Sequence, residues 1–143
     1  MKLNGFHKSE RLNSRTVIDK LFAGGNGSYA VFPLRVVFVP VTDEEAHGMM
    51  EGVPAAVLIS VPKRRFHHAV DRNRMKRLVR EAYRTNKHIL WDALEGKNLK
   101  LAIAFICITD TMPTQKQVEK AVRKSLVRIK EEPHLTSQKG RNL

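Results

Sequence analysis

The sequence predicts an α+β protein with a single αββαβα domain, in which helices pack on a small central sheet. The chain has 143 residues and is 42% hydrophobic, which suits one compact domain with a hydrophobic core. Apolar residues recur at helical spacing in some segments and form β-branched runs in others. We expect the domain to span residues 14–132, between a loosely held basic N-terminal arm (1–13) and a flexible basic tail (133–143).

The first half of the chain predicts one helix and two strands. Ser14 can cap a short helix, and Gly24-Gly25 would end it. The apolar face of this helix would consist of Val17, Ile18, Leu21 and Phe22. Residues 34–41 are rich in β-branched side chains and predict a strand, and a second strand is expected over about 53–61. The acidic, glycine-containing segment 42–52 between them is expected to be a hairpin connection.

The second half predicts a basic loop, a long helix, a strand and a last helix. The loop covers residues 63–68, and the helix should follow from about Asp71, its expected N-cap, to about residue 90. A third strand is expected over 99–108, and a helix over 114–130. The inner side of that last helix would carry Val118, Ala121, Val122, Leu126 and Ile129.

Positive charge is concentrated in one segment. The whole chain has a net charge of +12, and residues 63–87 hold ten basic and two acidic residues, a net +8. The basic residues are Lys63, Arg64, Arg65, Arg72, Arg74, Lys76, Arg77, Arg80, Arg84 and Lys87. Such a cluster attracts polyanions, and nucleic acid and anionic membranes are the natural candidates.

Helical spacing sorts this segment into two faces. At about 100° per residue, one sector contains Met75, Leu78, Val79 and Ala82 and would face the core. A neighbouring sector would face outward and contains Arg72, Asn73, Lys76, Arg77, Arg80 and Arg84. Solvated helix faces usually mix both signs of charge, whereas this face is nearly all positive and rich in arginine, which grips phosphate with a planar fork. The pattern predicts an anion-binding surface but does not distinguish RNA from DNA.

Membrane insertion and a disulfide are both disfavoured. The longest apolar run, residues 101–108, is far shorter than the roughly 20 residues of a membrane-spanning helix. No apolar stretch follows the first two residues, so we expect no secretory signal and a cytoplasmic protein. The lone Cys107 cannot form an intrachain disulfide and is expected to be a small core residue. Adjacent His67 and His68 are not expected to hold a metal ion.

One long motif carries a family resemblance. It comprises Ser60-Val61-Pro62-Lys63-Arg64, followed by Ala69-Val70-Asp71-Arg72-Asn73-Arg74-Met75-Lys76-Arg77-Leu78-Val79-Arg80-Glu81-Ala82-Tyr83-Arg84. This string resembles the signature of the bacterial ribonuclease P protein family. The resemblance implies a left-handed crossover between the strand, the motif helix and the next strand, against the usual right-handed preference. It also implies contact with the catalytic RNA by Lys63, Arg64, Arg65, Arg72, Asn73, Arg74, Lys76, Arg77, Arg80 and Arg84.

The resemblance implies a second surface, a cleft between the first helix and the sheet that holds the 5′ leader of precursor tRNA. The matching positions are Ile18, Phe22, Val36 and Phe38. Ile18 stands where an aromatic residue is frequent, and a one-residue shift of the strand would exchange its cleft and core faces.

The resemblance places the chemistry in the RNA. We expect RNA-bound Mg²⁺ in the holoenzyme, no catalytic side chain and no metal or cofactor required by the protein alone, and no protein oligomer is implied. Three alternatives stay open: a ribosomal protein or RNA chaperone, a DNA-binding regulator with an arginine-rich helix, and a stand-alone nuclease.

Overall fold

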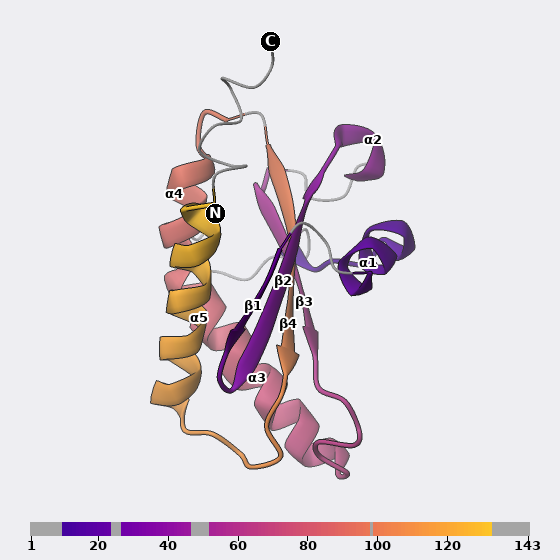
Figure 1. The fold of residues 1–143 in the computed structure, drawn as a ribbon, viewed down its shortest axis with the longest axis vertical. Helices are drawn as coiled ribbons and strands as arrows, with labels where there is room; N and C mark the ends of the chain where they lie inside the picture. Colours follow the sequence, from indigo (N-terminus) through magenta and orange to yellow (C-terminus); the bar gives the residue numbers. More distant parts are fainter. Residues whose placement is uncertain (1–9, 24–26, 47–51, 98, 133–143) are drawn as a thin grey trace.

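A computed structural model describes residues 10–23, 27–46, 52–97 and 99–132 of the chain. The tail 133–143 and the expected helix stop at Gly24-Gly25 lie outside these described residues. The elements are α1 (Arg15–Phe22), β1 (Gly27–Val31), β2 (Leu34–Val41), α2 (Asp43–Ala46), β3 (Ala55–Ser60), α3 (Ala69–Asn86), α4 (His88–Leu94), β4 (Lys100–Cys107) and α5 (Gln115–Lys130). The predicted α+β class, with helices on a small central sheet, is confirmed (Figure 1).

The described strands form one sheet in the order β1-β2-β4-β3. β2 pairs antiparallel with β1 and with β4, whereas β3 pairs in parallel with β4 and is joined to it through α3 and α4. The prediction that residues 42–52 form a hairpin is therefore wrong, because β4 lies between β2 and β3. β4 suits this inner position because residues 101–107 are all apolar, and residues 101–105 are fully buried there. The true hairpin partner of β2 is β1, a strand that was not predicted from the sequence.

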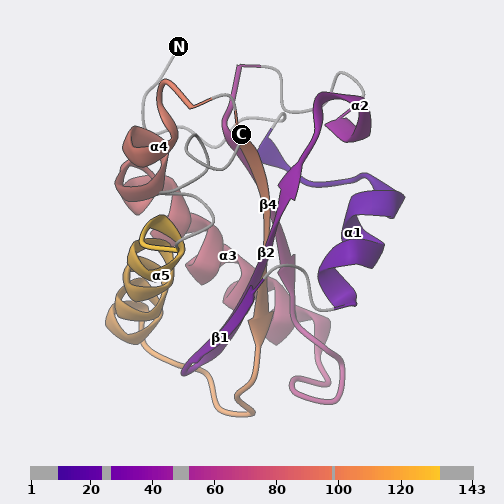
Figure 2. The ribbon, with the colours of Figure 1, turned by 45° about the horizontal axis from the view of Figure 1, so that its top comes forward.

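Two hydrophobic cores lie on opposite faces of the sheet. α3, α4 and α5 cover one face, and α1 covers the other, as the two views agree (Figures 1 and 2). The larger core contains alternate residues of β2, Leu34, Val36 and Phe38, together with side chains of all three helices. The smaller core contains the intervening β2 residues Val37 and Val39 with the buried side of α1. This alternation follows from the two-residue period of a strand.

The helix caps confirm several predicted boundaries. The Ser14 hydroxyl accepts a hydrogen bond from the Val17 amide at 3.4 Å, so α1 begins where the sequence predicts. Thr114 and Gln117 form a reciprocal capping box at the start of α5. The helix expected over 71–90 is instead two helices, α3 and α4, which meet at Lys87.

Lys87, where α3 meets α4, forms a buried ion pair. Its Nζ donates to both carboxylate oxygens of Glu10 at 2.9 and 3.0 Å, and the two side chains are almost completely buried. The same ammonium lies 4.3 Å from the ring centroid of Trp91. Nearby, the Leu12 amide donates to the Val57 carbonyl, and Leu12 is itself buried. Residues 10–12 are thus part of the packed domain, which corrects the expectation of a loose arm as far as residue 13; residues 1–9 lie outside the described part.

Candidate nucleic-acid interface

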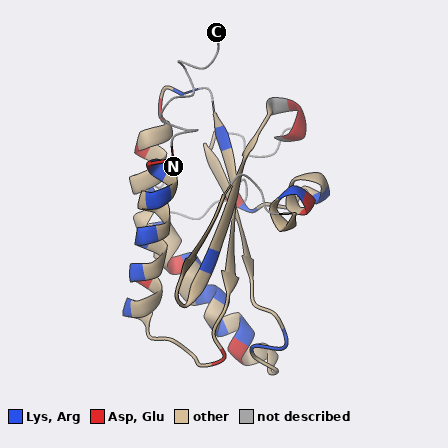
Figure 3. Ribbon diagram, in the orientation of Figure 1, with Lys and Arg blue, Asp and Glu red and all other residues tan. Residues whose placement is uncertain are grey.

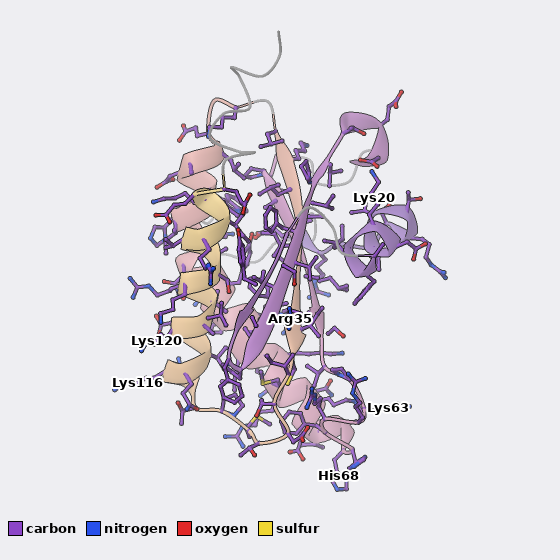
Figure 4. All side chains as sticks on the ribbon, viewed as in Figure 1. Lys20, Arg35, Lys63, His68, Lys116 and Lys120 are labelled. Atoms are coloured by element: carbon purple, nitrogen blue, oxygen red, sulfur yellow. The ribbon has the colours of Figure 1, made fainter. Side chains whose placement is uncertain are left out.

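The basic loop between β3 and α3 is held in place by backbone hydrogen bonds and by one buried side chain. The amides of Arg65 and Phe66 donate to the Pro62 carbonyl, which closes a tight turn. Phe66 is buried in the larger core and anchors the loop. Lys63 and Arg64 remain exposed at its tip. Figure 4 shows Lys63 and His68 at the same end of the molecule. The turn therefore presents two cations immediately before the helix that carries most of the others.

α3 has the two faces that its sequence predicts. Met75, Val79, Ala82 and Tyr83 are buried in the larger core, which fixes the rotation of the helix. Asn73, Arg74 and Arg77 are exposed, while Lys76 and Arg80 are half-buried. Basic residues consequently recur on the exposed side of α3, and Figure 3 shows them spaced along this helix. A buried apolar underside gives these charges fixed positions relative to one another.

Three of the predicted RNA-binding arginines have partners within the protein. Nη1 of Arg72 donates to the carbonyls of Phe66 and His67, both at 2.9 Å, so this side chain braces the loop against α3. Arg65 pairs with Asp110 at 3.1 Å. Arg84 donates from Nε to Glu81 at 3.1 Å, and this hydrogen bond and the guanidinium charge lower the pKa of the Glu81 carboxyl. The carboxylates thus partly neutralise Arg65 and Arg84.

The remaining cations make no ion pair within the described residues. They are Lys63, Arg64, Arg74, Lys76, Arg77 and Arg80, which we call the α3 surface. Uncompensated charges at helical spacing repel one another by a few tenths of a kcal/mol per pair, about 0.2–0.5. A bound polyanion would remove this repulsion and release its own counterions.

The start of α3 differs from its prediction. The helix begins at Ala69, two residues before the expected Asp71, and its N-cap is His68, whose side chain makes no capping hydrogen bond. The Asp71 amide donates to the His68 carbonyl at 3.1 Å. Asp71 therefore lies in the first turn, where its negative charge still favours the positive end of the helix dipole.

Two of the four residues predicted to line the leader cleft beside α1 lie elsewhere in the structure. Val36 and Phe38 are 0% exposed and lie in the larger core, on the sheet face opposite α1. Phe38 packs against Tyr29, with 6.0 Å between ring centroids. Their assignment to a leader cleft is wrong, because the strand alignment was shifted by one residue and each strand residue alternates between faces.

The β2 residues that share a face with α1 are the odd-numbered ones. Among them, Arg35 is exposed and donates to the Ser28 hydroxyl at 3.1 Å. Ile106 pairs with Arg35 across β2 and β4 and is half-buried on the same face. From α1, Ile18 is half-buried against the smaller core, while Phe22 is 55% exposed. We call Ile18, Phe22, Arg35 and Ile106 the α1 surface. The charge of Arg35 was the sequence signal that marks this face of the strand as open.

The described residues contain no group of three or more His, Cys, Asp or Glu side chains arranged to hold a metal ion. In the same ranges, no helix is long and apolar enough to cross a membrane. Cys107 is buried, and its burial raises the pKa of the thiol.

Comparison with known proteins decides the family. Residues 6–130 match the family described as ribonuclease P. The chain belongs to the ribonuclease P protein family. A protein of Porphyromonas gingivalis named ribonuclease P protein component is 45% identical over 125 residues, which cover 87% of this chain and 86% of that protein. A protein of Chlorobaculum tepidum with the same name is 30% identical, over 87% of this chain and 82% of its own length.

The fold of the ribonuclease P protein family is also seen in a solved structure. The structure of Staphylococcus aureus RNase P protein matches with a TM-score of 0.59 and 21% sequence identity, over 87% of this chain and 97% of that one. At this identity the match concerns the fold alone. It agrees with the four-stranded mixed sheet and its helical layers described above.

Proposed function

We propose that this protein is the non-catalytic protein component of ribonuclease P and acts in the cytoplasm. The RNA partner would supply the catalytic site and hold the Mg²⁺ needed for cleavage of precursor tRNA, and no side chain of this protein would take part in the chemistry. The protein would dock that RNA and hold the 5′ leader. Family membership supports this role, and the α3 surface is the structural observation that carries it.

The α3 surface suits a folded RNA because its charges form no ion pair with the described parts of the chain and are rigidly placed. Arg74 and Arg77 are one turn apart on the exposed side of α3, and their guanidinium forks can each bind a phosphate by two hydrogen bonds. Arg72 would act mainly by positioning, since its hydrogen bonds hold the loop that carries Lys63 and Arg64. Asn73, exposed between two arginines, can donate and accept hydrogen bonds at the same interface.

The α1 surface suits an unpaired RNA strand. The exposed ring of Phe22 offers a stacking platform for a base, with Ile18 as an apolar neighbour one helical turn away. Arg35 lies on the same sheet face and can bind a leader phosphate, and Ile106 lies beside it in the sheet. These residues replace the assignment of Val36 and Phe38, while Ile18 and Phe22 remain as proposed.

Reconstitution tests the proposal. The protein is added to a bacterial ribonuclease P RNA at low Mg²⁺, and cleavage of precursor tRNA is followed together with the affinities for precursor and mature tRNA. We expect stimulated cleavage and tighter binding of the leader-containing substrate. A ribosomal protein or RNA chaperone would bind both tRNAs equally, and that result would refute the proposal.

A matched pair of variants assigns the effect to the α3 surface. Arg77→Gln and Arg84→Gln each remove one positive charge from α3, but only Arg84 is already paired with a carboxylate. We expect Arg77→Gln to weaken assembly with the RNA more than Arg84→Gln does. Equal effects would show that the RNA responds to net charge and not to this surface.

A further inference from the structure

α5 carries a second concentration of positive charge. The helix holds one acidic residue, Glu119, and six basic ones: Lys116, Lys120, Arg123, Lys124, Arg128 and Lys130. At about 100° per residue, Lys116, Lys120, Arg123, Lys124 and Lys130 fall within a sector of about 120° and form a stripe about 21 Å long. The opposite side of α5, including Val118, Val122 and Leu126, is buried, so the stripe faces outward in a fixed orientation.

These cations are not neutralised within the described part of the chain. None of the six takes part in an ion pair there, and Lys116, Lys120, Arg123 and Lys124 are exposed. The first turn of α5 contains Lys116 and no acidic residue, although the helix dipole disfavours a cation at that end. Lys116 therefore lowers the stability of α5 slightly while it adds positive charge to this end of the helix.

An exposed aromatic ring lies beside the same helix. Phe32, at the turn between β1 and β2, is 67% exposed. It lines a shallow hollow together with Val31, Gln117, Lys120 and Lys124. A phenyl ring next to ammonium groups combines the two features that bind single-stranded nucleic acid, a stacking platform and a phosphate contact.

This region lies away from the α1 surface and from the loop before α3, although α3 and α5 pack against each other. Figure 4 shows Lys116 and Lys120 on one side of the molecule and Lys63 and His68 on the other. The helix α1 lies on the opposite face of the sheet from α5 (Figures 1 and 2). An RNA segment bound at the loop before α3 would therefore leave Lys116 and Lys120 accessible to another.

We propose that Phe32 and the basic stripe of α5 form a second RNA-binding surface that takes a single-stranded RNA segment. Its phosphates contact Lys116, Lys120 and Lys124, and an unpaired base stacks on Phe32. A duplex fits less well, because its base faces are already stacked on one another and leave nothing for the ring to cover. A membrane fits less well too, because an interfacial helix needs a free apolar face and that of α5 is buried in the core. This surface goes beyond the proposed function, which uses α3 and α1.

Binding of a fluorescent oligouridine of about 12 nucleotides, within the usual site size of such proteins, tests the inference. For Lys116→Gln/Lys120→Gln/Lys124→Gln, we expect the negative slope of log K against log salt to become shallower by about 2, which is about 0.7 for each lost phosphate contact. For Phe32→Ala, we expect affinity to fall by about 5- to 160-fold, as for loss of one stacked base. The charge-preserving Lys→Arg triple variant and Phe32→Trp should retain binding, and thermal melting of each variant confirms that it is folded.

Photocrosslinking with 4-thiouridine in the oligonucleotide locates the contact directly. We expect crosslinked peptides from the β1–β2 turn and α5. Crosslinks confined to α1 or α3, with wild-type slopes for the α5 variants, would overturn the inference while leaving the proposed function intact. Conversely, the α5 variants could lose oligouridine binding while the wild-type protein fails to stimulate ribonuclease P RNA. That combination would support this surface and refute the proposed function. If the α5 variants lose binding to phosphatidylserine vesicles but not to oligouridine, the surface is not one for RNA.

Discussion

Breaking the buried ion pair between Lys87 and Glu10 should cost more stability than breaking any of the exposed ion pairs in the described part of the chain. In Lys87→Met, the Glu10 carboxylate, 0% exposed, loses both of its hydrogen bonds from the ammonium. Removing one partner of a buried pair typically costs about 3–5 kcal/mol, because a buried charge is left without compensation. With a urea dependence of about 2 kcal/mol per M, the unfolding midpoint should fall by about 2 M.

Urea unfolding followed by Trp91 fluorescence measures this effect, since the indole lies against Lys87 and is the only tryptophan of the chain. Lys20→Met is the matched control, because it breaks an exposed pair with Glu45 and should cost at most about 1 kcal/mol. The double variant Glu10→Leu/Lys87→Met should recover most of the loss, since apolar side chains of similar size often replace a buried pair without cost. The reasoning would be refuted if the stability losses of Glu10→Leu and Lys87→Met simply added in the double variant. It would also be refuted if Lys87→Met lost no more stability than Lys20→Met.

Three other predictions concern packing, capping and titration. Gly27→Ala places a β-carbon 2.7 Å from Cε1 of Phe38, so we expect a loss of about 1–3 kcal/mol in urea unfolding; an unchanged midpoint would contradict this close contact. Thr114→Ala removes the hydroxyl of the α5 capping box and should cost about 1 kcal/mol, whereas Thr114→Ser should melt close to wild type. Partial burial and the hydrogen bond to Glu132 raise the pKa of Tyr29 to about 12, and burial raises the pKa of Tyr83. The tyrosine hydroxyls ionise near pH 10 in the unfolded chain but stay protonated in the folded protein, so the free energy of unfolding should fall as pH rises from 10 towards 12. Phenolate absorbance that appears near pH 10, before the protein unfolds, would contradict this prediction.

Local patterns in the sequence were sufficient for several elements. The cap at Ser14, the bounds of the strand 34–41 and the apolar side of α5 were all predicted, because each depends on neighbouring residues. The buried side of α3 followed equally from its spacing, with Met75, Val79 and Ala82 in the core. The resemblance carried by the motif of α3 agrees with the family shown by comparison.

Long-range contacts were not predictable in the same way. The short edge strand β1 has only five residues, and its partner β2 was assigned to a different hairpin. The faces of Val36 and Phe38 depend on sheet register, which a one-residue shift inverts. The carboxylates that pair with Arg65 and Lys87 come from residues 45 and 77 positions away, so no local pattern could show that these cations are compensated.

The salt dependence of assembly with ribonuclease P RNA tests the central claim most directly. Arg74→Gln/Arg77→Gln removes two exposed cations of the α3 surface that make no ion pair with any residue the structure describes. If each contacts one phosphate, the slope of log K against log salt should become shallower by about 1.4–1.8. A slope equal to that of the wild-type protein would show that these arginines face solvent in the complex.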